Sequence, residues 1–199
     1  PEITQMQVEA ISLAAIDLLS KGIACLPEIM VPLVGSLNEF INQRDIIKRT
    51  ILKIQSSCGV QFDFLIGTMV ELPRACFIAD KIAKNADFIS FGTNDLTQTT
   101  FGFSRDDINT FLNHYLDNKI IKFDPFQSID RGGVGELIKI AIKKAQDSNP
   151  NIKLGICGEH GGDPNSIQFF NQIKLNYVSC SPFRVPIARL SAAQAIFNK

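Results

Sequence analysis

The sequence predicts an α/β fold built around a parallel β-sheet. In its 199 residues, five short apolar runs of strand length alternate with longer segments of helical periodicity, and no Ser-, Gly- or Pro-rich linker interrupts them. This alternation is typical of parallel sheets covered by helices. An open doubly wound sheet and a (β/α)₈ barrel both fit it. Because a barrel needs eight strands in roughly 250 residues, five strands indicate either an open sheet or part of a barrel.

Boundary residues mark the elements in the first half of the chain. Residues 5–20 have helical periodicity, and Lys21-Gly22 is a typical helix end. Ser36 and Glu39 have the spacing of a capping box, which predicts a second helix through Ile54. Pro73 suits the first turn of a third helix. The apolar runs between these helices predict strands over residues 28–32, 62–70 and 86–91.

The second half shows the same alternation. Asp106 is predicted to cap a helix through Leu116. Asp163 followed by Pro164 is a helix cap with proline at the first helical position, which predicts a helix to about Lys174. The remaining segments are predicted as helices over residues 135–146 and 186–197 and as strands over residues 153–157 and 176–180.

Composition excludes several classes of protein. Twenty Lys and Arg residues balance twenty Asp and Glu residues, which argues against binding to nucleic acid or an anionic membrane through charge. No apolar run approaches the roughly 18–20 residues that span a bilayer. The first residues lack a signal-peptide pattern. Five scattered cysteines and two histidines form no disulfide or zinc spacing, so reduced thiols in a cytoplasmic compartment are expected.

Polar clusters follow four of the predicted strands. They are Glu71, Gly92 to Asp95, Cys157 to Gly162, and Ser179 to Ser181, and all four are expected at the same rim, where the active site of a parallel α/β fold forms. Two carboxylates without neighbouring basic residues suit Mg²⁺, which takes one or two carboxylates together with substrate and water oxygens. Asp95 has an alternative interpretation as the cap of a following helix.

Cys157 is the candidate reactive thiol. It lies between two glycines at a strand end, where small neighbours let a ligand approach the sulfur. With an ordinary pKa of about 8.5, a thiol stays mostly protonated at neutral pH and can act as an acid. Two alternatives remain open: inert packing, which is usual for free cysteines, and a nucleophilic pair with His160.

Four motifs carry a resemblance to a known family over essentially the whole chain. Ser90 to Gln98, continuing to Asp107, resembles the second signature of the phosphoenolpyruvate-utilising enzymes, and Gly155 to Pro164 resembles their cysteine loop. Gly67 to Ala75 and Asn176 to Arg189 are similar to their metal-glutamate strand and closing segment. The His-Gly-Gly version of the cysteine loop and the run Phe-Gly-Phe-Ser-Arg-Asp-Asp are similar to the pyruvate, phosphate dikinase branch of that family.

The resemblance implies a role for each candidate site residue. It implies Mg²⁺ ligation by Glu71 and Asp95, and Cys157 as the catalytic acid that protonates the pyruvate enolate, or as the base in the reverse direction. It also implies that phosphoenolpyruvate or pyruvate is bound by Glu71, Ser90, Gly92, Thr93, Asn94 and Asp95.

The resemblance also implies a (β/α)₈ barrel, of which this chain supplies the C-terminal five βα units. Residues 1–199 are therefore expected to form one N-terminally truncated domain. The swivelling phosphohistidine domain, the ATP-grasp domain and two substrate-clamping arginines of the family have no counterpart here, so the isolated chain is expected to be inactive. The family also dimerises through its barrel. The alternatives are a non-catalytic dimerisation fragment, or a fragment of a phosphoenolpyruvate synthase or of the phosphotransferase-system enzyme I.

Overall fold

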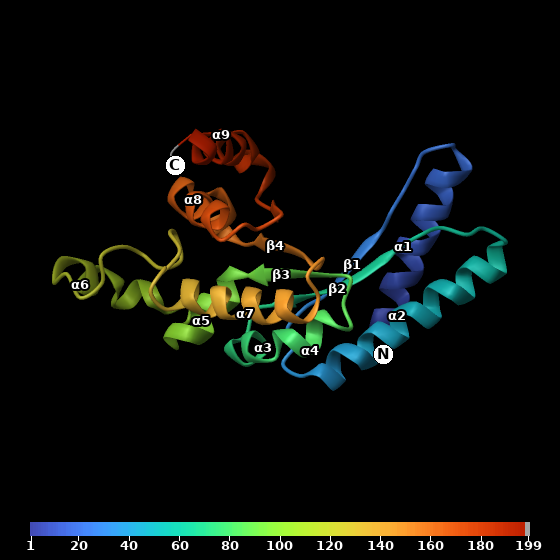
Figure 1. The fold of residues 1–199 in the computed structure, drawn as a ribbon, viewed down its shortest axis with the longest axis horizontal. Coiled ribbons are helices and arrows are strands. Elements are labelled where there is room, and N and C mark those ends of the chain that lie inside the picture. Colours follow the sequence, from blue (N-terminus) through green and yellow to red (C-terminus); the bar gives the residue numbers. More distant parts are fainter. Residues whose placement is uncertain (198–199) are drawn as a thin grey trace.

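The computed structural model describes residues 1–197 and contains a five-stranded parallel sheet (Figure 1). The strands lie side by side in chain order: β1 (Glu28–Val31), β2 (Leu65–Val70), β3 (Phe88–Gly92), β4 (Lys153–Cys157) and β5 (Tyr177–Val178). A doubly wound sheet reverses its strand order at a switch point, whereas a barrel keeps sequential order. The chain therefore forms five consecutive βα units of an incomplete (β/α)₈ barrel, as predicted.

Helices follow each strand. Their bounds are α1 (Glu2–Ser20), α2 (Leu37–Cys58), α3 (Pro73–Phe77), α4 (Ala79–Ala83), α5 (Thr93–Phe101), α6 (Leu112–Asp117), α7 (Val134–Ser148), α8 (Pro164–Gln172) and α9 (Val185–Phe197). Figure 1 shows α3, α4 and α7 along one side of the strands, α8 packed on α9, and α1 beside α2. Within residues 1–197, no helix combines the length and apolar character needed to cross a membrane.

Two predicted helix caps are confirmed. The Glu39 N–H donates to Ser36 Oγ at 3.3 Å, and the Ser36 N–H donates to Glu39 Oε2 at 3.3 Å, which completes the capping box of α2. Asp163 caps α8 by accepting the Ser166 N–H at 2.9 Å, with Pro164 at the first helical position. Both caps satisfy backbone donors that a helix start leaves without partners.

The predicted helix from Asp106 to Leu116 is wrong. The Asp106 side chain caps no helix; residues 108–110 form one 3₁₀ turn, and α6 begins only at Leu112. The helix after β3 is α5, which begins at Thr93 without a side-chain cap. We call residues 103–133, between α5 and α7, the insertion. It folds around its own apolar cluster, whose buried members are Ile108, Leu112 and Phe126.

The last strand is shorter than predicted. Backbone hydrogen bonds from the N–H groups of Asn176 and Ser179 to β4, both 2.8 Å long, flank β5 without extending it. The remaining boundaries differ from the predicted ones by a few residues. Such shifts are usual for helix and strand ends, whose hydrogen bonds are incomplete.

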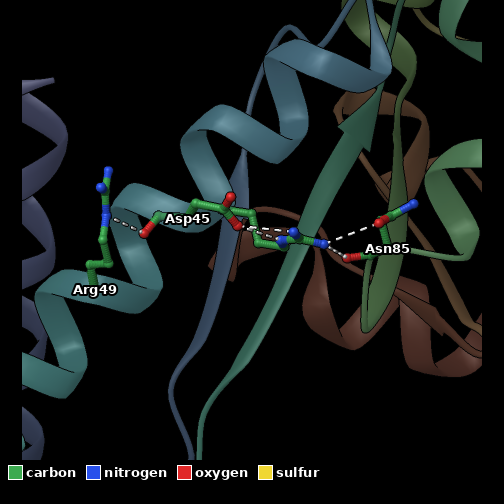
Figure 2. Close-up of polar contacts among 4 residues, drawn as sticks. Asp45, Arg49 and Asn85 are labelled. Carbon is green, nitrogen blue, oxygen red and sulfur yellow. Dashed lines mark hydrogen bonds and ion pairs between the residues drawn. The ribbon is translucent and has the colours of Figure 1, made fainter.

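Polar contacts also fix the start of β3. Arg44 on α2 donates from one guanidinium nitrogen to Asn85 Oδ1 at 3.1 Å, and from another to Asp45 Oδ1 at 2.9 Å. Figure 2 shows these contacts, together with the 3.2 Å bond from Arg49 to the Asp45 carbonyl. Asn85 precedes β3, so this cluster lies at the N-terminal ends of the strands. In a barrel, residues at that end contribute to stability, and the catalytic residues lie at the opposite end.

Candidate active site at the carboxyl ends of the strands

The register of the sheet brings three strand ends together. Gly92 pairs with Cys157, and Val70 pairs with Phe91, so Glu71 follows directly beside Gly92. A cleft of about 410 Å³ opens at this point. It is lined by Pro32, Leu33, Met69, Glu71, Gly92, Thr93, Asn94, Asp95, Cys157 and Gly158.

Six of the seven predicted site residues line this cleft. The seventh, Ser90, is fully buried within β3. The fourth polar cluster, Ser179 to Ser181, does not line this cleft: Cys180 lines a separate cavity beside α8 and α9. The backbone ends its pairing with β4 at Ser179 and turns away toward α9.

Glu71 is held in a buried position by its neighbours. It is 3% exposed, and its Oε1 accepts the Leu33 N–H at 2.6 Å. Leu33 adopts a left-handed φ of 53°, an uncommon conformation for a non-glycine residue. A Cβ at position 92 would lie 2.3 Å from Glu71 Oε2, so only glycine leaves room for this carboxylate. Burial raises the pKa of Glu71, and the negative charge of Asp95 raises it further.

The two carboxylates form a small donor set. Within residues 1–197, no three or more His, Cys, Asp and Glu side chains gather in a way that suits a metal ion. Glu71 and Asp95 supply two hard oxygen ligands beside a cleft, and their mutual repulsion favours a cation between them. A divalent ion that completes its shell with water and substrate oxygens fits this donor set.

The cysteine loop, residues 157–163, is seated against the start of α5. The Thr93 hydroxyl donates to the Cys157 carbonyl at 3.0 Å, and the Glu159 N–H donates to Asn94 Oδ1 at 3.1 Å. Gly158 has a φ of 115°, and a Cβ there would lie 2.6 Å from Thr93 Oγ1. A glycine is therefore required between the thiol and the rest of the loop.

Cys157 is the one cysteine in residues 1–197 that lines this cleft. Its Sγ lies 3.8 Å from the Phe91 carbonyl. Burial raises the pKa of the thiol, the Ser90 hydroxyl lowers it, and the charges of Glu71 and Asp95 raise it again. The group therefore keeps its proton at neutral pH, as an acid must.

Tyr177 was missed by the sequence analysis. Its ring packs over Gly155, where a Cβ would lie 1.9 Å from the ring carbon Cζ. Burial raises the pKa of Tyr177, and the Ser90 hydroxyl lowers it. Ser90 Oγ is buried without a hydrogen-bond partner, and the Ser90 hydroxyl lowers the pKa of Cys157 as well as that of Tyr177. A glycine in the middle of β4 was the available signal for a large neighbouring ring.

His160 does not pair with the Cys157 thiol. It is fully buried, its Nδ1 lies 2.8 Å from Thr93 Oγ1, and its Nε2 lies 2.8 Å from the Pro125 carbonyl oxygen. Burial lowers the pKa of the ring. Both ring nitrogens are thus occupied, which removes the alternative of a Cys–His nucleophile.

Comparisons with known proteins identify the family of the chain. The family described as "PEP-utilising enzyme, PEP-binding domain" matches residues 1–197. The chain is 55% identical over 196 residues to a chloroplastic pyruvate, phosphate dikinase of Flaveria bidentis, covering 98% of this chain and 21% of the relative. It is 54% identical to pyruvate, phosphate dikinase 1 of Arabidopsis thaliana and 53% identical to pyruvate, phosphate dikinase 2 of Zea mays, again over 98% of this chain. The chain thus spans about a fifth of the length of these relatives.

One solved structure supports the fold. A citrate lyase from Burkholderia xenovorans superposes with a TM-score of 0.54 at 12% identity, covering 83% of this chain and 48% of the lyase. This likeness concerns the arrangement of strands and helices alone. The match to the family model rests on the sequence itself, and it extends through every strand end that lines the cleft. The chain belongs to the family of PEP-binding domains of the PEP-utilising enzymes.

Proposed function

We propose that this chain is the phosphoenolpyruvate- and pyruvate-binding part of a Mg²⁺-dependent pyruvate, phosphate dikinase. Such an enzyme interconverts ATP, phosphate and pyruvate with AMP, diphosphate and phosphoenolpyruvate. The observation that carries the proposal is the placement of a protonated thiol, Cys157, in the same cleft as the two carboxylates Glu71 and Asp95. The dikinase names of the relatives favour this enzyme over a phosphoenolpyruvate synthase or enzyme I.

Glu71 and Asp95 are proposed to hold the Mg²⁺. When bound, the ion would act as a Lewis acid that stabilises negative charge on the enolate oxygen of pyruvate. Glu71 is pre-positioned for this role by the Leu33 N–H and by the space that Gly92 leaves. Gly92, Thr93 and Asn94 border the substrate at the start of α5, where backbone N–H groups attract a carboxylate or phosphate.

Cys157 is proposed to move one proton. In the direction of pyruvate formation its S–H donates to the methylene carbon of the enolate, and the thiolate then regains a proton from solvent. In the reverse direction the thiol first loses its proton to solvent, and the thiolate then removes a proton from the methyl group. The Ser90 hydroxyl lowers the pKa of the thiol, and it is proposed to stabilise the transient thiolate. The raised pKa of the thiol makes it a poor resting nucleophile and an effective reservoir for this proton.

The rest of the reaction needs other parts of a longer protein. A swivelling phosphohistidine domain, an ATP-grasp domain and the clamping arginines would come from the four fifths of the relatives' length that this chain does not span. A homodimer through the barrel is part of the proposal. All five cysteines are free, which fits a reducing compartment, either the cytoplasm or an organelle.

A second candidate function is a non-catalytic association module. Exposed apolar side chains on and before α9 favour it: Phe183 is 94% exposed and Leu190 is 61% exposed. A titration with pyruvate and Mg²⁺ separates the two functions, because a pure association module shows no Mg²⁺-dependent binding.

The decisive experiment is Cys157→Ala in the complete enzyme. We expect pyruvate formation to be abolished, while ATP-dependent phosphorylation of the histidine continues, because the two half-reactions use different domains. Cys58→Ala, at an exposed cysteine outside the cleft, is the matched control and should retain both half-reactions. Loss of both half-reactions in Cys157→Ala would show that the residue is structural.

A further inference from the structure

We propose that His160 is a positioning residue that fixes the cysteine loop against Thr93 and couples this loop to the insertion. The kinetic part of this inference rests on the proposed function. The structural part rests only on the contacts described below. His160 touches no atom of the thiol, so its effect on the chemistry must pass through its neighbours.

The proton on the His160 ring is fixed by its partners. The Pro125 carbonyl can only accept a hydrogen bond, so the Nε2 atom, 2.8 Å away, carries the proton. Burial favours the neutral ring, which leaves Nδ1 as an acceptor. The Thr93 hydroxyl, 2.8 Å from Nδ1, therefore shares its one proton between Nδ1 and the Cys157 carbonyl.

Thr93 connects this ring to the thiol-bearing residue. Its hydroxyl has one proton and two acceptors, His160 Nδ1 at 2.8 Å and the Cys157 carbonyl at 3.0 Å. Thr93 is itself fully buried, so the hydroxyl has no water as an alternative partner. If the contact with the His160 ring is lost, the Thr93 hydroxyl is free to rotate. This rotation changes its hydrogen bond to the Cys157 carbonyl and, through the backbone, the direction of the Cys157 side chain.

The second ring nitrogen, Nε2, contacts the insertion through Pro125. Pro125 lies between Asp124, whose Oδ1 accepts the Phe126 N–H at 2.8 Å, and Phe126, a buried member of the insertion's apolar cluster. A cavity of about 550 Å³ is lined by both the insertion and the cysteine loop. Three other hydrogen bonds, each 2.9 Å long, hold the insertion: Ser128 to Asp163, the Ile129 N–H to Ser166 Oγ, and Arg131 to the Asn165 carbonyl. The last two reach α8, so among the described residues His160 makes one of the two hydrogen-bonded links between the insertion and the loop itself.

Two substitutions separate the two links. His160→Asn keeps a polar atom near the Nδ1 position, so it retains the Thr93 contact and loses the Pro125 contact. His160→Gln keeps a donor near the Nε2 position, so it retains the Pro125 contact and loses the Thr93 contact. The chain's other histidine, His114, is exposed on α6 and touches only Asn118 through its ring, so His114→Asn and His114→Gln are matched controls.

The experiment uses the complete enzyme and three readouts: kcat and KM for pyruvate, iodoacetamide labelling of Cys157 resolved by mass spectrometry, and hydrogen exchange of residues 103–133. For His160→Gln we expect kcat to fall at least about tenfold with KM nearly unchanged, altered Cys157 labelling, and normal exchange in the insertion. For His160→Asn we expect faster exchange in the insertion, with kcat and labelling within about threefold of the parent. Both His114 variants should match the parent.

The inference is overturned if the two His160 variants behave alike in all three readouts, because a ring that merely fills space distinguishes neither nitrogen. It is also overturned if neither variant differs from the parent. If the complete enzyme has no dikinase activity, the proposed function fails. Labelling and hydrogen exchange still decide the role of His160 in that case.

Discussion

Gly92→Ala tests whether the position of the Glu71 carboxylate controls cation binding. The backbone at Gly92 has a φ of −85°, which alanine adopts freely, so the substitution adds contact and no backbone strain. The new Cβ would lie 2.3 Å from Glu71 Oε2 and 2.8 Å from Glu71 Cβ. Both distances are shorter than contacts found in proteins, so the Glu71 side chain must move from its present position.

The size of the effect follows from this displacement. Overpacking by one methyl group costs about 1–3 kcal/mol. If that cost must be met whenever Glu71 returns to bind the cation, the cation affinity falls by about 5- to 150-fold. Because Asp95 is not displaced, we expect weakened binding rather than complete loss. The assay is the Mg²⁺ concentration that gives half-maximal activity of the complete enzyme, supported by direct titration with Mn²⁺.

Two comparisons make the test specific. Gly132→Ala is the control, because position 132 has an ordinary φ and its nearest atom to a new Cβ is Asp130 Oδ1 at 3.7 Å. In a Glu71→Asp background, the shorter side chain makes the added methyl less costly, so the two substitutions should be non-additive. Unchanged cation affinity in Gly92→Ala would refute the assignment of Glu71 as a metal ligand.

Two further predictions concern the chain itself. The isolated 199-residue chain should associate, because β1 and β5 are edge strands with unpaired backbone groups; light scattering that shows a stable monomer would contradict this. It should also show no dikinase turnover, because it spans about a fifth of the length of its relatives. Acid should destabilise the fold through His160, whose pKa is lowered by burial. Stability is then lost as pH falls from about 6.5 toward the lower folded-state pKa. The parent should have a lower urea midpoint below that pH range than above it, and this difference should shrink in His160→Gln. A difference as large in the variant as in the parent would count against this explanation.

Much of the fold is encoded in local signals. The capping box of Ser36 and Glu39 and the Asp163-Pro164 pair predict helix starts because they satisfy specific backbone groups. The strand count alone left the open sheet and the partial barrel undecided, because strand order depends on pairing between distant segments; the family resemblance predicted the barrel. The α5 helix was anticipated only in the alternative that Asp95 caps a following helix; it begins instead at Thr93 without a side-chain cap, and its only fully buried apolar side chain is Leu96.

The site was predictable to the extent that it depends on strand ends. Glu71, Asp95 and Cys157 follow successive apolar runs, and parallel strands place such residues at one rim. The contacts of His160 and Tyr177 were not predictable from spacing, because their partners Pro125 and Gly155 lie 35 and 22 residues away in the sequence (160 − 125 and 177 − 155). Their contacts depend on how the insertion and β5 pack in three dimensions.

The insertion also has a consequence for the order of folding. Paired residues are 21 positions apart between β2 and β3 (Thr68 and Ile89) and 22 apart between β4 and β5 (Gly155 and Tyr177), but 65 apart between β3 and β4 (Ser90 and Gly155). Closing the longest of these loops costs about 1 kcal/mol more in chain entropy than closing the shorter ones. We therefore expect β3 and β4 to join last among these pairs. The carboxylates and the thiol are on opposite sides of that junction, so a folding intermediate can complete the proposed cation site while the thiol is still absent.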